Sequence, residues 1–383
     1  MTRNTSNQST GQDRLSYEKA YKSKSLQQRL FACAMEANVP VYLLGAPGIG
    51  KTEFISSYAK RNGYVFELLP APHLEPGDIT GLPVEASGSD GKFRTQFAEM
   101  QWIDNLNKGK KSILFIDELP LASDETKKAL LSVVQGRKAG THKIGDHVRI
   151  VAAGNPMSWS FESVPLSAPM RTRMLHIQWE FDSNEWIRHH RDGYANWTPP
   201  SIPAGTKLMS EDMCRQLDGI FYDSGSQLIQ AATLNDIDPE APFNVARSWD
   251  NVYTIMRHIP DGDYDVLHAA MSGLVGEAMA TRVSALLRYN LPIQEIIANP
   301  YSFDWMNESG DRVYAALLSI TDRALDKQAR NVTSEIAAEI FEAAANSGCA
   351  DIAWGFLVRL MDEDPNYEVS QQIAVTFKDY LEG

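Results

Sequence analysis

The residues with the clearest chemical meaning lie at Gly45–Thr52, which reads GAPGIGKT. This is the pattern G-x-x-x-x-G-K-T, in which glycines let several backbone N–H groups approach one anion and the lysine reaches its outer phosphates. The hydroxyl of Thr52 is placed to ligate Mg²⁺. We therefore expect this segment to bind the phosphates of a nucleotide. The expected binding residues are Gly45, Ala46, Pro47, Gly48, Ile49, Gly50, Lys51, Thr52 and Glu53.

Two carboxylates follow a later apolar run. Ile113–Ile116 is apolar throughout, and Asp117 and Glu118 come directly after it. Because ligands of open α/β sheets bind outside the carboxyl ends of parallel strands, both side chains should lie at the phosphate loop. We expect Asp117 to hold Mg²⁺ together with Thr52, and Glu118 to act as the general base that polarises the attacking water.

Three further polar side chains are candidates for catalysis. Asn155 follows the apolar run Val148–Ala153 and would hydrogen-bond the terminal phosphate or the attacking water. An Asn-Pro turn is the alternative interpretation. Arg171 and Arg173 end a short helix from which they would reach the nucleotide of a neighbouring subunit, where a guanidinium stabilises phosphoryl charge. The alternative is a pair of surface arginines.

Strands and helices alternate around these residues, which predicts an α/β fold with a parallel-sheet core. Two stretches at residues 83–96 and 138–147 are typical of hairpins. After Ser183 the pattern becomes helical, and Gly273–Tyr289 is expected to form one amphipathic helix. The predicted strands are residues 39–44, 64–69, 113–116, 148–153 and 174–179.

Composition and charge limit the class of protein. The 383 residues are 43% hydrophobic and 22% charged, as in globular proteins of two or three domains. The net charge of −13 disfavours a general binder of nucleic acid or of anionic membranes. Cys33, Cys214 and Cys349 lack metal-site spacing, and we expect buried free thiols. No apolar run reaches the length of a membrane span and no signal peptide is evident, so we expect a cytoplasmic protein.

The motifs GAPGIGKT, LFIDEL and AAGNP, the arginine pair before a strand and Arg247 at the start of a later helix together resemble the AAA+ ATPases. The two expected hairpins resemble the helix-2 insert and the pre-sensor-1 insert of the MoxR group within that superfamily. LEPGDITGLP and GLVGEAMATRVSALLRYNLPIQEIIANP also look like MoxR-type sequences. The resemblance covers about residues 25–300, and the last eighty residues match only loosely.

The resemblance implies a role for each matching residue. Gly45–Thr52 would be Walker A, and Asp117 with Glu118 would be Walker B. Asn155 would be sensor 1, and Arg247 would be sensor 2, reaching from a lid to the γ-phosphate. The arginine finger matches Arg173 best, because the family has an arginine followed by an apolar or aromatic residue at this position. T-R-M stands here in place of the commoner D-R-F, so Arg171 remains the alternative.

The resemblance also implies an architecture and partners. A flexible tail at residues 1–24 would precede an AAA+ α/β core at 25–182, an α-helical lid at 183–300 and a C-terminal helical region at 301–383. Members of the group bind ATP and Mg²⁺ and form hexameric rings. They commonly act with a partner that carries a von Willebrand factor A domain, as chaperones of protein clients.

Three functions remain open from the sequence. The first is an ATP-driven machine that remodels or activates protein complexes. The second is a DNA motor of the translocase or restriction type, favoured by the basic stretch Arg137–Lys143 and opposed by the acidic total charge. The third is a ring scaffold with a structural nucleotide, which the presence of Asp117, Glu118 and the arginine pair disfavours. A guanine-specific site is disfavoured because Asn107–Lys110 lacks the required aspartate.

Overall fold

The protein is described by a computed structural model that covers residues 21–87, 93–159, 164–192, 196–224, 229, 238–289, 291–325 and 332–381. The chain divides into two compact units. The first comprises Met1–Met209 and Ala231–Gly276, and the second comprises Ser210–Gln230 and Glu277–Gly383. Most of the expected N-terminal tail lies outside the described residues, and the four-part division expected from the sequence stays a prediction.

The first unit is built on a five-stranded sheet in the order β2-β5-β8-β1-β9, with every pair parallel. The strands closely match the apolar runs in the sequence, which confirms the α/β fold with a parallel-sheet core. The strands are β1 (Val41–Leu44), β2 (Val65–Pro70), β5 (Ser112–Asp117), β8 (Val148–Gly154) and β9 (Leu175–Gln178).

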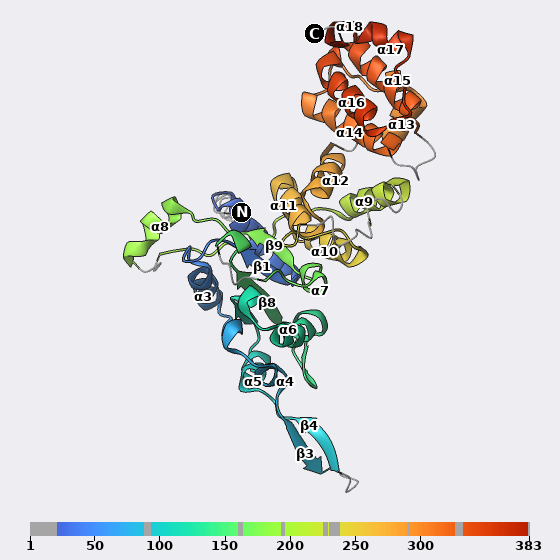
Figure 1. Ribbon diagram of the computed structural model, residues 1–383. Helices are drawn as coiled ribbons and strands as arrows, with labels where there is room; N and C mark the ends of the chain where they lie inside the picture. The colour runs from blue at the N-terminus through green and yellow to red at the C-terminus, as the bar shows by residue number, and fades with distance from the viewer. Residues whose placement is uncertain are drawn as a thin grey trace, which may run out of the picture. The chain divides into compact units, whose positions relative to one another are not determined.

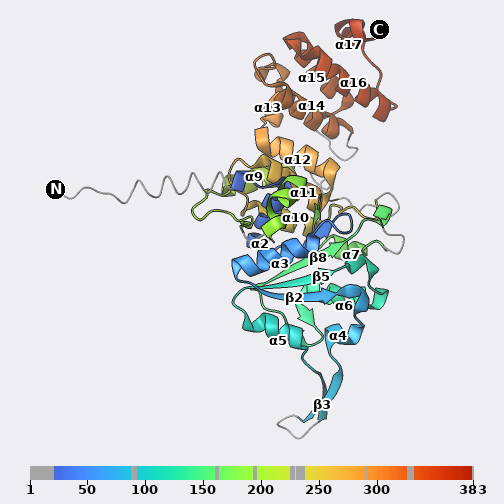
Figure 2. The same ribbon diagram turned by 90° about the vertical axis from the view of Figure 1, so that its left-hand side faces the viewer.

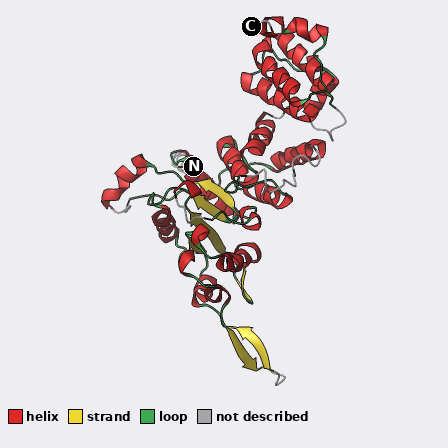
Figure 3. Ribbon diagram, in the orientation of Figure 1, coloured by secondary structure: helices red, strands yellow, loops and turns green. Residues whose placement is uncertain are grey.

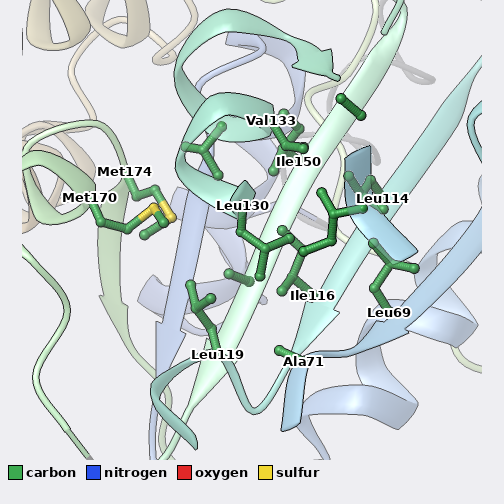
Figure 4. Close-up of a cluster of buried hydrophobic side chains, with 14 of the residues drawn as sticks. Leu69, Ala71, Leu114, Ile116, Leu119, Leu130, Val133, Ile150, Met170 and Met174 are labelled. Carbon is green, nitrogen blue, oxygen red and sulfur yellow. The ribbon is translucent and has the colours of Figure 1, made fainter. Parts of the chain in front are cut away.

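Helices cover both faces of this sheet (Figures 1 and 2). Helix α3 (Lys51–Asn62) packs on one face, and α5 (Gln101–Lys108) and α6 (Asp124–Gly136) cover the other. Figure 4 shows the second face, where side chains of β5 and β8 such as Ile116 and Ile150 lie against Leu130 of α6. Because successive side chains of a strand point to opposite faces, strands covered on both faces read as continuous apolar runs.

Two antiparallel hairpins interrupt the α/β core. The first pairs β3 (Pro83–Ser87) with β4 (Phe93–Phe97) and extends away from the sheet in Figure 1. The second pairs β6 (Lys138–Ala139) with β7 (His142–Lys143). Both hairpins predicted from the sequence are therefore confirmed. The remaining helices of the first unit are α2 (Leu26–Ala37), α4 (Pro76–Thr80), α7 (Ala168–Arg171), α8 (Ser183–His189), α10 (Ala246–Met256) and α11 (Tyr264–Val275).

The described part of the second unit consists of helices, without strands, as Figure 3 shows. Its core is a cluster of buried apolar side chains centred on α14, α15 and α16, with Leu317, Phe341 and Leu357 fully buried. Its helices are α9 (Glu211–Ser224), α12 (Glu277–Tyr289), α13 (Ile293–Ala298), α14 (Gly310–Leu325), α15 (Ser334–Ala344), α16 (Ala350–Glu363), α17 (Gln371–Thr376) and α18 (Lys378–Leu381).

One helix prediction is wrong. The stretch Gly273–Tyr289 forms two helices, because α11 ends at Val275 and α12 begins at Glu277. Gly276 between them has a φ of 92° and a ψ of 155°, a backbone conformation that glycine adopts without strain and L side chains rarely adopt. The division between the two units falls at the same residue.

Two smaller expectations concern thiols and membranes. Cys33 and Cys214 are buried, but Cys349 is only half-buried, so the expectation of three buried thiols is wrong for Cys349. The three cysteines form no disulfide. Among the helices that the structure describes, none combines the length and the apolar character needed to cross a membrane.

Candidate nucleotide site

The loop after β1 has the backbone shape that its glycines predict. Gly48 and Gly50 have φ values of 77° and 87°, which L side chains rarely adopt. A Cβ at Gly45 would lie 2.3 Å from the carbonyl oxygen of Trp179, so a larger residue there would displace the backbone. Helix α3 begins at Lys51, directly after the loop. The loop therefore presents a helix N-terminus and its backbone N–H groups to one point, which is an arrangement that binds anions.

The ammonium group of Lys51 lies at the centre of the site. It donates hydrogen bonds to the carbonyl oxygens of Gly45 over 2.7 Å and Ala46 over 2.9 Å, and to Asn155 Oδ1 over 2.9 Å. Burial lowers the pKa of Lys51, while the carboxylates of Asp117 and Glu118 oppose that shift. The lysine is thus held inside the loop, next to both carboxylates.

The ends of three adjacent strands bring the polar side chains together. Strand β8 lies between β5 and β1, so Asp117 from β5, Asn155 after β8 and the loop after β1 share one edge of the sheet. The Thr52 hydroxyl donates a hydrogen bond to Asp117 Oδ2 over 2.8 Å. Glu118 is exposed, and its φ of 54° is unusual for a residue with a side chain. Strained backbone of this kind is concentrated at functional sites.

The donor set at Thr52 and Asp117 fits Mg²⁺. This ion prefers oxygen ligands and is usually held by one or two protein groups, with phosphate oxygens and waters in its other positions. A hydroxyl oxygen and a carboxylate oxygen 2.8 Å apart provide such a pair. Within the described residues, no group of three His, Cys, Asp or Glu side chains is placed to hold a metal. Thr52 and Asp117 are therefore the residues that would hold the ion.

The two candidate finger arginines have different surroundings. Arg171 is only 6% exposed, and its Nη1 donates to the carbonyl oxygens of Asp238 and Ala241, each over 2.8 Å. Arg173 is half-buried and donates to the carbonyl oxygen of Pro169 at the start of its own helical turn. Arg171 thus has a fixed internal role, whereas Arg173 is the more accessible guanidinium.

Arg247 is exposed at the start of α10. Burial lowers the pKa of the Arg173 guanidinium, and the charge of Arg247 lowers it further. The charges that act on Lys51 are instead those of Asp117 and Glu118. Hydrogen bonds join Lys51 to Asn155 and Thr52 to Asp117, and the charges of Asp117 and Glu118 act on Lys51. The charge of Arg247 acts on Arg173.

A cavity of about 270 Å³ lies beside the phosphate loop and was not predicted from the sequence. Its wall combines Gly48–Gly50 with a group of aromatic side chains. Phe54 packs against Trp179 and Trp197, with ring centroids 4.4 and 5.5 Å apart. The sequence feature that could have indicated this cavity is the group of aromatic residues between positions 179 and 197. The aromatic residues of the wall are Phe54, Trp179, Phe181, Trp186 and Trp197.

In the basic stretch that favoured a DNA motor, Arg137 is bonded internally, whereas Lys138 and Lys143 are exposed. Arg137 donates to the carbonyl oxygens of Gly145 and Val148 over 3.2 and 2.8 Å. Arg149 donates to the carbonyl oxygen of Met35. The guanidinium groups of Arg137 and Arg149 are therefore engaged with backbone carbonyl oxygens of the first unit.

A comparison with known protein families finds a match over the part of the chain that forms the nucleotide site. Residues 40–174 match the AAA domain family of the dynein-related subfamily. No curated protein matches the chain. A candidate ATPase from Cytophaga hutchinsonii has a similar structure, with 14% identity, a TM-score of 0.39 and coverage of 63% of this chain and 78% of its own.

Two further solved structures are similar over part of the chain. NtrX from Brucella abortus is 14% identical, with 60% of this chain and 59% of its own covered and a TM-score of 0.29. A full-length MCM homologue from Methanopyrus kandleri is 13% identical, with coverage of 66% and 55% and a TM-score of 0.38. The chain thus spans less than two thirds of either protein. Because all three TM-scores are below 0.5, these likenesses assign no activity to this chain.

The family match includes the phosphate loop, the two carboxylates after β5 and Asn155 after β8. It ends at residue 174, directly after the arginine pair. Residues 40–174 of this chain are an AAA domain, and the AAA+ part of the resemblance is confirmed.

Proposed function

We propose that the chain is a MoxR-like AAA+ ATPase that hydrolyses ATP with Mg²⁺ and uses the cycle to remodel or activate protein complexes. The observation that carries the proposal is the convergence of three strand ends on the phosphate loop. There, Lys51 contacts Asn155 and Thr52 contacts Asp117. An AAA domain at residues 40–174 agrees with it.

Each residue of this group has a defined task in the proposed reaction. Lys51 and the backbone N–H groups of the loop would bind the phosphates of ATP and offset their charge. Glu118 would accept the proton of the attacking water at a carboxylate oxygen. Asn155 would orient that water or the γ-phosphate through its amide. Mg²⁺ held by Thr52 and Asp117 would supply further positive charge where negative charge develops on the phosphates.

The aromatic cavity would take the base of the nucleotide. It begins at Gly48–Gly50, so a base lying in it would be close to phosphates in the loop. Phe54, Trp179 and Trp197 supply flat faces on which a base can stack. This placement supports a nucleotide, rather than a simple phosphate, as the ligand.

We further propose that the active form is a ring, in which Arg173 acts on the nucleotide of the next subunit and Arg247 reaches the γ-phosphate as sensor 2. The support for Arg173 is that its guanidinium is more accessible than that of Arg171, which is buried. The MoxR resemblance is the basis for proposing a hexamer, a partner with a von Willebrand factor A domain, and protein clients.

A trapping experiment tests the remodelling function. Tagged Glu118→Gln protein, which should bind ATP without hydrolysing it, is expressed in its native cell and purified in ATP. The matched control carries Lys51→Ala in addition, so that it cannot bind ATP. A protein partner with a von Willebrand factor A domain, enriched only in the trap, is the expected result. Nuclease-sensitive nucleic acid without a protein partner would contradict the proposal and favour a DNA motor.

A further inference from the structure

A short segment of the first unit, residues 238–243, is held by hydrogen bonds from Arg171 at the end of α7. Arg171 Nη1 donates to the carbonyl oxygens of Asp238 and Ala241, and its guanidinium lies 5.1 Å from the ring centroid of Phe243. Arg171 is 6% exposed, so these contacts are shielded from water. A buried guanidinium that satisfies two carbonyl oxygens holds both firmly, because separating them would leave polar groups unpaired. The 238–243 segment is therefore tied to α7, two residues before Arg173.

The same segment reaches the loop that follows β8. Glu240 Oε1 accepts a hydrogen bond from the backbone N–H of Met157 over 2.9 Å. Met157 is two residues after Asn155, and Pro156 between them has a fixed φ. Holding Met157 in place therefore restricts where Asn155 can lie. No feature of the sequence marked Glu240 for this contact, since 83 residues separate it from Met157.

The backbone that carries Glu240 is itself held in a turn. Its backbone N–H donates to Asp238 Oδ1 over 2.9 Å, and Ala241 N–H donates to the carbonyl oxygen of Asp238 over 3.1 Å, which closes a turn. Glu240 also lines a cavity of about 10 Å³ together with Tyr42, Arg171 and His176. Burial raises the pKa of Tyr42, and the charge of Glu240 raises it further, as expected for a carboxylate near that hydroxyl. The acceptor for Met157 is thus held on a defined turn.

We propose that Glu240 is a positioning residue for the ATP hydrolysis proposed above. It holds the 155–157 loop so that Asn155 stays within hydrogen-bonding distance of Lys51. Through the 238–243 segment it also links Asn155 to Arg171, and thereby to the turn that carries Arg173. This inference rests on the proposed function, because positioning Asn155 matters for catalysis only if the site hydrolyses ATP.

The link is a continuous series of contacts rather than a spatial coincidence. Lys51 contacts Asn155, the Asn155 loop contacts Glu240, and the segment that contains Glu240 contacts Arg171. All of these residues belong to the first unit. A displacement of the turn that carries Arg173, on contact with a neighbouring subunit, would therefore shift Asn155. A displacement of Asn155 would likewise shift that turn.

Glu240→Ala and Glu240→Gln separate positioning from general stability. The alanine variant removes the acceptor for Met157 N–H, whereas glutamine keeps an oxygen at the same place. Glu36→Ala, which removes an exposed glutamate of α2, is the control. For each variant we would measure kcat and KM for ATP, the affinity for ATP, and the amide hydrogen exchange of a peptide that contains residues 154–159.

The alanine variant should lose about tenfold in kcat, with ATP affinity within about twofold of wild type, because a misplaced group mainly affects the transition state. Exchange of the Met157 amide should become roughly fivefold to tenfold faster, as expected for the loss of one hydrogen bond. The glutamine variant should recover most of both properties, and Glu36→Ala should behave as wild type.

Unchanged kcat or unchanged exchange in Glu240→Ala would overturn the inference, as would a glutamine variant that is no better than alanine. Wild-type protein without ATP hydrolysis would instead overturn the proposed function, and the positioning role of Glu240 with it. The exchange measurement distinguishes the two failures, since it reports on the Met157 contact whether or not the protein turns over ATP.

Discussion

The Lys51 ammonium group contacts Asn155 Oδ1 over 2.9 Å, although 104 residues separate the two in the chain. The contact follows from the register of the sheet, in which Leu44 of β1 is paired with Gly154 of β8. The residues that follow two neighbouring parallel strands must emerge side by side. A cation and an amide are thereby fixed together at the place where an AAA domain binds nucleotide.

Asn155→Ala should lower the turnover of ATP by about 10- to 100-fold, because it removes a fixed dipole from the site of charge development. The affinity for ATP should change much less. Steady-state kinetics and a titration with a fluorescent ATP analogue would measure the two effects. Asn62→Ala, at the end of α3, is a control for loss of an amide elsewhere. Equal turnover in wild type and Asn155→Ala would contradict a catalytic role.

Lys51→Ala should abolish stabilisation of the protein by ATP. A ligand that binds only the folded state stabilises it by about 2.7 kcal/mol at one hundred times its dissociation constant. Thermal unfolding with and without ATP and Mg²⁺ would therefore show a rise in Tm for wild type and none for the variant. Lys60→Ala, exposed on the same helix, should retain the rise. A normal ATP-dependent shift in Lys51→Ala would be incompatible with the assigned phosphate site.

Alanine substitution of Arg171 should mainly lower stability, whereas alanine substitution of Arg173 should mainly lower ATP turnover. Arg171→Ala leaves the carbonyl oxygens of Asp238 and Ala241 without their donor, which should cost about 1–3 kcal/mol of stability and lower Tm. Arg173→Ala should leave Tm close to wild type and reduce turnover by about a thousandfold or more, as for arginines supplied in trans.

Mixing the Arg173→Ala and Lys51→Ala proteins tests the trans arrangement. Mixed rings would contain interfaces with an intact arginine beside an intact phosphate loop, so some ATPase activity should return. Either protein mixed with itself is the control. No recovery, under conditions where subunit exchange is demonstrated, would argue against Arg173 as the finger.

His176 should make stability depend on pH. Burial lowers the pKa of His176 from 6.5 to about 4. Between these values the unfolded chain binds a proton that the folded chain does not, so stability is complete above pH 6.5 and declines as the pH falls towards 4. The decline should reach about 3 kcal/mol.

His176→Gln, which does not titrate, should show a smaller loss of Tm between pH 7 and pH 5 than wild type. Differential scanning calorimetry at the two pH values would measure it. Identical losses in the two proteins would show that His176 does not titrate in this window.

Local patterns predicted the strands and the phosphate loop because both depend on neighbouring residues. An apolar run such as Ile113–Ile116 is buried on both faces wherever it lies in a parallel sheet. The break at Gly276 was missed because apolar residues on both sides of it continue the helical spacing, and only the backbone reveals the positive φ of this glycine.

Features that depend on distant contacts could not be predicted. The sequence left Arg171 and Arg173 as alternatives for the arginine finger. They differ because Arg171 is buried against a segment some seventy residues away. The aromatic cavity assembles Phe54 with side chains of a much later stretch. Glu240 belongs to no sequence motif, and its proposed role depends on one hydrogen bond from the distant Met157.

The most direct test of the central claim is the release of phosphate from ATP by wild type and by Glu118→Gln protein, with Glu125→Gln on α6 as the control. Loss of a general base costs about 10²- to 10⁴-fold in rate. We predict Mg²⁺-dependent hydrolysis by wild type and the control, and ATP binding without hydrolysis by Glu118→Gln. No hydrolysis by wild type in its assembled form, or undiminished hydrolysis by Glu118→Gln, would contradict the assignment of this site as an ATPase centre.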